Sequence, residues 1–165
     1  MKSYFLEEFK NTNDYIKFIN YMLINSDCFS LVYFKYREDE KTKKGIKEIQ
    51  ELLKPFKLHS ARTNKWPGTV TYDDKHIYKL VFYTSKQECL SALSQVDNIF
   101  GWNYPMAPMD LCFYKDGYCW FSSISHERMA FLNTDENECI QQLQEIGANL
   151  KFIGEENNLF YMDSV

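Results

Sequence analysis

The residues best suited to chemistry lie in one short run, Ser122 to Glu127, with the sequence Ser-Ser-Ile-Ser-His-Glu. A histidine titrates near neutral pH and can activate a serine, so His126 is a candidate general base with Ser125 as its nucleophile. Glu127 and the more distant Asp110 are the candidate carboxylates. Adjacent strand residues point to opposite faces, and no glycine elbow surrounds these serines. A structural histidine at a strand end is therefore the competing interpretation.

The sequence patterns of metal and cofactor sites are missing. The three histidines are far apart without ligand-spaced neighbours, and the five cysteines include no CxxC pair. The six glycines are isolated, which excludes a phosphate-binding glycine loop and disfavours dinucleotide binding. The basic residues between Lys35 and Lys57 are neutralised by interleaved acids. We therefore expect no cofactor, no metal and no nucleic-acid partner.

Two loops combine tryptophan with proline and short polar residues, at Arg62 to Thr69 and at Phe100 to Met109. Because Trp, Tyr and Arg dominate interface hot spots, these loops are candidate partner-binding surfaces. Their candidate contact residues are Arg62, Trp66, Trp102 and Tyr104. The alternative is that Trp66 and Trp102 close the two ends of the core.

Charge is distributed unevenly along the chain. The net charge is −4, but the residues from Asp135 onward include seven acids and one base. Such an acidic lobe, with Glu155 and Glu156 as its candidate contacts, would attract a basic partner over a distance that salt shortens. The alternative is an ordinary acidic helix surface.

The composition indicates one globular domain in a reducing compartment. A chain of 165 residues matches one ordinary domain, and we expect residues 1–165 to form it. The first ten residues contain Glu7, Glu8 and Lys10, unlike a secretory signal, and no apolar stretch is long enough to cross a membrane. We therefore expect a cytoplasmic protein with reduced thiols, no membrane contact and an oligomeric state left open.

Hydrophobic periodicity predicts helices in four places. The strongest signal is at Tyr15 to Leu23, after possible caps at Asn11 to Asn13. A second helix runs from Ile46 and breaks near Pro55. Ser85 and Glu88 have the spacing of a capping box before a third helix, and a fourth follows Asn133 or Thr134 and stops near Gly147.

The remaining segments predict strands, at Cys28 to Tyr36, His76 to Thr84, around the Asp116-Gly117 turn, Met129 to Leu132, and the pair Leu150 to Ile153 and Leu159 to Met162. A two-residue turn at Asp116-Gly117 would place Tyr114 opposite Cys119, and Cys112 opposite Phe121. Both faces of this hairpin are apolar, so we expect it to be central in the sheet. The fold class is α+β, with about four helices and a mostly antiparallel, possibly mixed, sheet.

Three segments in order resemble a signature of small uncharacterised bacterial proteins of the low-GC Gram-positive type. They are Trp66-Pro67-Gly68-Thr69, Pro108-Met109-Asp110-Leu111-Cys112-Phe113 and Ser123-Ile124-Ser125-His126-Glu127. The chain departs from this pattern at Met109, where an acid is expected. In size and acidity it is also similar to immunity proteins that neutralise toxins, a class analogy that assigns no residue a role.

These observations support three functional hypotheses. The first is a non-enzymatic protein-binding module, of the immunity or inhibitor type, whose acidic lobe and tryptophan loops cover a basic toxin or effector. The second is a small hydrolase or transferase with His126 as general base, which requires an accessible pocket around that residue. The third is a sensor domain with an apolar cavity lined by Tyr and Trp.

Overall fold

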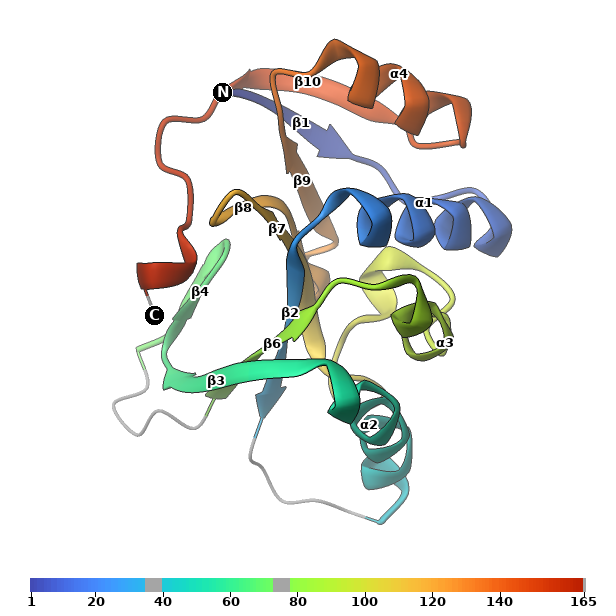
Figure 1. The fold of residues 1–165 in the computed structure, drawn as a ribbon, viewed down its shortest axis with the longest axis vertical. Helices are drawn as coiled ribbons and strands as arrows, with labels where there is room; N and C mark the ends of the chain where they lie inside the picture. Colours follow the sequence, from blue (N-terminus) through green and yellow to red (C-terminus); the bar gives the residue numbers. More distant parts are fainter. Residues whose placement is uncertain (35–39, 73–77, 165) are drawn as a thin grey trace.

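A computed structural model describes residues 1–34, 40–72 and 78–164 of the chain. Eight of the described strands form one sheet in the order β10-β1-β9-β8-β7-β2-β6-β3, and every neighbouring pair is antiparallel (Figure 1). The strands are Lys2–Leu6 (β1), Cys28–Phe34 (β2), Lys57–Thr63 (β3), Tyr78–Thr84 (β6), Met109–Lys115 (β7), Tyr118–Ile124 (β8), Met129–Asn133 (β9) and Leu150–Glu155 (β10). A small separate hairpin pairs Lys65–Trp66 (β4) with Thr69–Val70 (β5).

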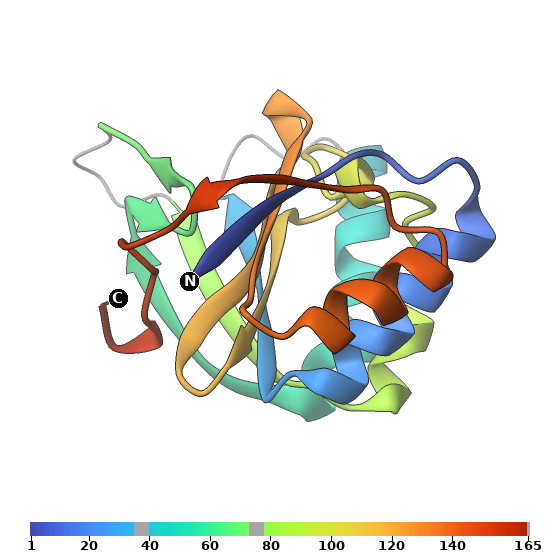
Figure 2. The same cartoon turned by 90° about the horizontal axis from the view of Figure 1, so that it is seen from above.

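The helices of the described residues gather on one face of this sheet, while the β4–β5 hairpin and the C-terminal segment lie on the other (Figure 2). The α-helices are Thr12–Asn25 (α1), Glu40–Leu53 (α2), Leu90–Leu93 (α3) and Asn137–Glu145 (α4). Short 3₁₀ turns are Lys54–Phe56 (η1), Gln87–Cys89 (η2), Ile99–Gly101 (η3), Ser125–Glu127 (η4) and Met162–Ser164 (η5). The predicted fold class, α+β with a mostly antiparallel sheet, is confirmed, and the sheet is antiparallel rather than mixed.

Local sequence explains where the two long helices begin and end. The Asn11 side chain accepts a hydrogen bond from the backbone N–H of Asp14 at 2.9 Å and caps α1. The buried face of α1 follows the predicted spacing, with Tyr15, Phe18, Ile19, Met22 and Leu23. Helix α2 ends at Leu53, and Pro55 lies in the 3₁₀ turn that follows, as the missing proline N–H predicts.

The core has two parts, one on each face of the sheet. The larger cluster lies between the sheet and the helices and includes Phe18, Phe29, Phe113 and Phe121. The second cluster lies on the opposite face, under the β4–β5 hairpin and the C-terminal segment; it contains Cys28, Val32, Trp66, Leu80, Phe82, Cys112, Tyr114 and Cys119. The prediction that β7 and β8 are central and covered on both sides is therefore confirmed.

Two local predictions are wrong and one strand is missing from the prediction, each for an identifiable reason. The Ser85 hydroxyl donates to the Leu23 carbonyl at 2.8 Å instead of capping a helix, and the turns that follow begin after Lys86. Strand β1 was not predicted, because its five residues are too short for a clear alternation. The segment Leu159 to Met162 makes one bridge, between Tyr161 and Tyr118, and no strand of its own.

The β7–β8 register also differs in one detail from the prediction. Tyr114 faces Cys119 as expected, but a bulge at Trp120 places Cys112 opposite Ser122 rather than Phe121. The expected strand start at His76 lies outside the described residues, as do the last two residues of the strand predicted from Cys28 to Tyr36. No helix among the described residues is long and apolar enough to span a membrane.

All five cysteines are buried and free. Burial raises the pKa of the Cys28 thiol to about 12 and that of Cys89 to about 11. At neutral pH the Cys28 and Cys89 thiols are protonated and unreactive, because the thiolate is the nucleophilic form. They therefore act as small apolar side chains.

Strand pairing divides the sheet into two ends. The partners Phe34 and Tyr78, and Ile124 and Met129, lie at one end, together with the start of β7. We call it the Asp110 end. The partners Cys28 and Thr84, and the turn from Lys115 to Tyr118, lie at the other, the Lys115 end.

Candidate functional site

The buried carboxylate of Asp110 joins two loops at the Asp110 end of the sheet. The indole Nε1–H of Trp66, on β4, donates to Asp110 Oδ2 at 2.8 Å. The backbone N–H of Ser125, in η4, donates to Asp110 Oδ1 at 2.9 Å. The three segments that the sequence singles out thus meet at one side chain, although they are far apart along the chain.

The conformation of Asp110 is specialised for this position. Its φ of 54° lies in the left-handed region, which aspartate tolerates better than most residues, and its backbone N–H donates to the Trp102 carbonyl at 3.1 Å. The side chain is 2% exposed. Burial raises the pKa of Asp110, and the hydrogen bonds from Ser125 and Trp66 partly oppose that effect.

The β4–β5 hairpin is also held by close packing against β8. Gly68 has a φ of +75°, and a Cβ added there would lie 2.6 Å from Ile124 Cδ1. Glycine is needed at this turn for both its backbone angle and the contact. The Pro67-Gly68 turn is therefore the element that seats Trp66 over Asp110.

The four candidate catalytic residues are close in space without forming a catalytic arrangement. Ser125 is 2% exposed and its hydroxyl lies 3.4 Å from that of Ser123, which donates to the Leu111 carbonyl. The His126 side chain is 55% exposed, with Nε2 3.6 Å from a Glu127 carboxylate oxygen. Among the described residues, no hydrogen bond joins Ser125 to His126.

Arg128 closes the turn after η4. It adopts a φ of 54°, pairs with Glu8 and lies over the Phe100 ring, with its guanidinium carbon 5.2 Å from the ring centroid. A cation over an aromatic face is stabilised by the ring quadrupole. Two residues with left-handed backbone, Asp110 and Arg128, therefore border the His126 turn, and such residues persist only where surrounding contacts fix them.

The two tryptophans expected as exposed anchors lie in the core, which corrects that prediction in favour of the alternative interpretation. Trp66 is 3% exposed, because it covers the second apolar cluster and bonds to Asp110. Trp102 is fully buried and its indole N–H donates to the Tyr15 hydroxyl at 2.9 Å. Neither indole presents a surface to a partner in this structure.

The other candidate contacts are more accessible. Arg62 is exposed on the edge strand β3, and Tyr104 is half-buried with its ring 5.6 Å from that of Phe34. Glu155 is exposed on β10, opposite Lys2 of β1. Glu156 is half-buried and accepts a hydrogen bond from the Asn158 N–H at 2.6 Å.

Exposed apolar side chains at the Asp110 end were not identified from the sequence. Tyr72 is 99% exposed, Met106 77% and Val70 60%. Ring contacts run between their two loops, from Trp66 to Tyr78, from Tyr78 to Phe34 and from Phe34 to Tyr104. The sequence pattern that could have identified these side chains is an apolar residue inside a loop rich in Pro and Gly. Such a residue does not belong to the buried face of a helix or strand.

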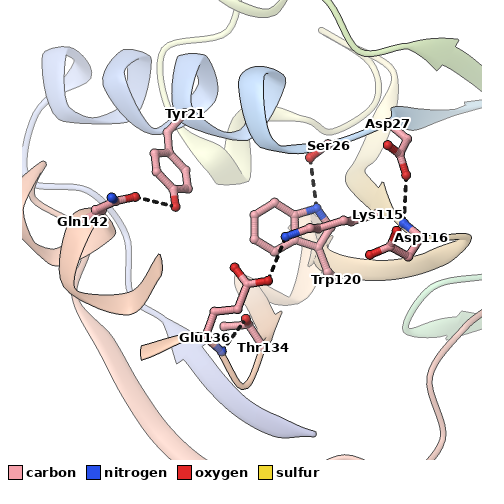
Figure 3. Close-up of polar contacts among 9 residues, drawn as sticks. All are labelled: Tyr21, Ser26, Asp27, Lys115, Asp116, Trp120, Thr134, Glu136 and Gln142. Atoms are coloured by element: carbon pink, nitrogen blue, oxygen red, sulfur yellow. Dashed lines mark hydrogen bonds and ion pairs between the residues drawn. The ribbon is translucent and has the colours of Figure 1, made fainter. Parts of the chain in front are cut away.

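The Lys115 end holds a different polar cluster, between α1, α4 and the β7–β8 turn (Figure 3). The Lys115 ammonium lies 2.9 Å from a Glu136 carboxylate oxygen and over the Trp120 ring. The Trp120 indole N–H donates to Ser26 at 2.9 Å, and the backbone N–H of Asp116 to Asp27 at 2.8 Å. These contacts fasten the turn to α1 and β2.

Among the acids of the lobe, Glu136 is ion-paired within the chain, and others accept hydrogen bonds from neutral N–H groups. Glu136 pairs with Lys115, and Asp135 accepts the backbone N–H of Lys2 at 2.9 Å. Glu138 and Glu145 accept hydrogen bonds from glutamine amides on α4. Hydrogen bonds from neutral groups do not cancel charge, so the lobe keeps most of its negative charge, spread over α4, β10 and the segment that follows.

Comparison of the chain with protein-family models, with curated proteins and with solved structures gives no match. Among residues 1–34, 40–72 and 78–164, no three His, Cys, Asp or Glu side chains are grouped so that they could hold a metal ion. The geometry of the Asp110 end is therefore the basis for a functional assignment.

Proposed function

We propose that the chain is a non-enzymatic protein-binding module, of the immunity or inhibitor type, that contacts a toxin or effector through the Asp110 end. The observation that carries the proposal is the exposure of three apolar side chains on two loops, each of which also contains a buried tryptophan. Tyr72, Val70 and Met106 extend from segments fixed by buried contacts at Trp66 and Trp102. Preorganised loops lose little conformational entropy on binding.

The chemistry of this surface favours a protein partner over a reaction. Aromatic and methionine side chains are enriched at interface cores, and methionine adapts to different surfaces. The exposed His126 and Glu127 add polar groups at the same end of the sheet. The excess of acidic residues would increase the rate at which a basic partner arrives, without determining where it binds.

The hydrolase hypothesis has less support from the geometry. A serine nucleophile must reach both its base and the substrate, whereas Ser125 is buried and bonded to Ser123. The sensor hypothesis requires a cavity lined by Tyr and Trp. The lining of the cavity described below contains three lysines and one tyrosine, Tyr83, and does not include a tryptophan.

Pull-down from the native cytosol with three matched proteins tests the proposal. Wild type is compared with the double variant Tyr72→Ser and Met106→Ser, and with a control, Ile24→Ser and Tyr161→Ser, which removes exposed apolar area elsewhere (58% and 53% exposed). We expect a protein retained by wild type and control and lost by the Tyr72 and Met106 variant. Equal retention by all three, or no specific capture, would contradict the proposal.

A further inference from the structure

A cavity of about 240 Å³ lies between α2 and the β3–β6 edge of the sheet. It is separate from the Asp110 cluster and shares no lining residue with it. The lining residues come from the end of α2 with η1, from β3 and from β6: Gln50, Glu51, Lys54, Lys57, Lys79, Val81 and Tyr83. In Figure 1, α2 leads directly into β3 at this edge.

Three lysines from three elements line this cavity, and Lys79 is the most informative. Side chains alternate along a strand, so Lys79 shares a face with Val81 and Tyr83, which are 4% and 3% exposed and belong to the larger core. That face is otherwise apolar along β6. Lys79 itself is exposed, and it places a cationic side chain beside that apolar face, where it lines the cavity.

The charge of the cavity is positive. Lys54, Lys57 and Lys79 contribute three ammonium groups and Glu51 one carboxylate. The Glu51 carboxylate lies 3.9 Å from the Lys54 ammonium, and both side chains are 75% exposed. This exposed pair contributes little. The other two lysines, Lys57 and Lys79, have no carboxylate partner within the cavity lining.

Besides the three lysines, the cavity lining includes Tyr83, whose buried hydroxyl is a further hydrogen-bonding group. The Tyr33 and Tyr83 hydroxyls are 2.8 Å apart, and either could donate. Two hydroxyls hold two protons and this bond uses one, so one O–H remains to donate to a third group. Burial raises the pKa of Tyr83 to about 12, which keeps its hydroxyl protonated at neutral pH.

We propose that this cavity binds a small phosphate dianion, either free phosphate or the phosphoryl group of a small monoester. Lysine ammonium groups bind phosphate as point charges, and the tyrosine O–H supplies a directional bond to one oxygen. Pockets for drug-sized ligands occupy roughly 300–1,000 Å³. The volume here therefore limits the organic part of the ligand to a few heavy atoms.

Titration with inorganic phosphate, followed by ¹H–¹⁵N NMR in 150 mM chloride, tests the site. We expect saturable shifts of the β6 amide signals in wild type. The double variant Lys57→Gln and Lys79→Gln should bind at least about tenfold more weakly, because two charge-assisted contacts are lost. The control Lys10→Gln, which removes an exposed lysine before α1, should bind like wild type.

Glu51→Gln provides a test that does not depend on the stability of the double variant. It removes the opposing carboxylate from an exposed position and should tighten phosphate binding about twofold or more. Shifts without saturation, equal weakening by Lys10→Gln, or no change with Glu51→Gln would overturn the proposal.

A parallel titration with glycerol phosphate separates the two sources of the dianion. Tighter binding than inorganic phosphate would assign the site to a monoester whose organic part contacts the lining. Equal or weaker binding would assign it to free phosphate. Absence of binding by both would overturn the proposal.

Discussion

At the Asp110 end a buried carboxylate accepts two N–H bonds, whereas at the Lys115 end the Glu136 carboxylate is 61% exposed and pairs with an ammonium group. Both clusters fasten a turn to the sheet. They differ in whether water can replace a lost contact. An exposed group that loses its partner can bond to water, whereas a buried donor that loses its acceptor stays unpaired. The two ends should therefore respond very differently to the same kind of substitution.

The largest effect is expected from Asp110→Ala. It leaves the Trp66 indole N–H and the Ser125 backbone N–H without an acceptor, and it places alanine at a left-handed φ. We expect the free energy of unfolding to fall by about 3 kcal/mol or more, measured by urea denaturation. Asp110→Asn should cost less, because it keeps one acceptor oxygen and tolerates the backbone angle.

If Asp110→Ala proved no more harmful than Glu136→Gln, the comparison between the two ends would fail. The denaturant slope should stay constant between the variants, so that the midpoints report stability alone.

A smaller difference is expected between two glycine substitutions, one at each end. Gly68→Ala meets both a φ of +75° and the Ile124 side chain, while Gly117 has a φ of +80° with nothing within 4 Å of an added Cβ. We expect about 1 kcal/mol for Gly117→Ala from backbone strain, and about 2 kcal/mol or more for Gly68→Ala. Thermal or urea unfolding of both variants gives the difference.

Truncation of the neighbouring side chain serves as the control for that prediction. Adding Ile124→Ala to Gly68→Ala should make the two effects less than additive, because the clash is relieved. Strict additivity would show that the Gly68 cost comes from the backbone alone.

The pH dependence of stability distinguishes Asp110 from its asparagine variant. Burial raises the folded-state pKa of Asp110 above the unfolded value, so the folded state binds the proton more tightly. The contribution of Asp110 is therefore greatest below about pH 3.9 and is lost as the pH rises to the folded-state pKa, by at most about 1.4 kcal/mol per pH unit.

Urea denaturation of wild type and Asp110→Asn across this range isolates the effect as a difference between the two proteins. Other carboxylates titrate equally in both and cancel. A wild-type stability that rose relative to the variant over the same pH range would contradict a raised pKa.

The smallest effect is expected from Lys115→Gln or Glu136→Gln. This pair is partly exposed, and such pairs contribute about 0–1 kcal/mol. Each change should lower the free energy of unfolding by less than about 1 kcal/mol, and the loss should shrink in high salt. A larger, salt-independent loss would mean that the two ends are alike.

Regular periodicity is what made much of the fold predictable. Helix α1 has a strong 3.6-residue pattern, and the Asp116-Gly117 turn identifies the central hairpin. Predictions failed where a distant contact replaced a local one. Ser85 has the sequence of a cap, yet its hydroxyl bonds to Leu23 on a neighbouring element.

The candidate site was predictable in its members but not in its connections. Asp110, Ser125 and His126 were identified by residue type, whereas the bond from Trp66 to Asp110 joins residues 44 apart in sequence. No local pattern encodes that pairing. The burial of Trp102 likewise depends on its bond to Tyr15, which only the packing of α1 provides.

Hydrogen exchange in Asp110→Asn tests most directly whether one carboxylate organises the proposed binding end. Backbone amides in residues 66–70 and in residues 123–127 should exchange faster together, while those in residues 115–120 stay as in wild type. Faster exchange in only one of the two segments, or an equal increase throughout the chain, would contradict the account.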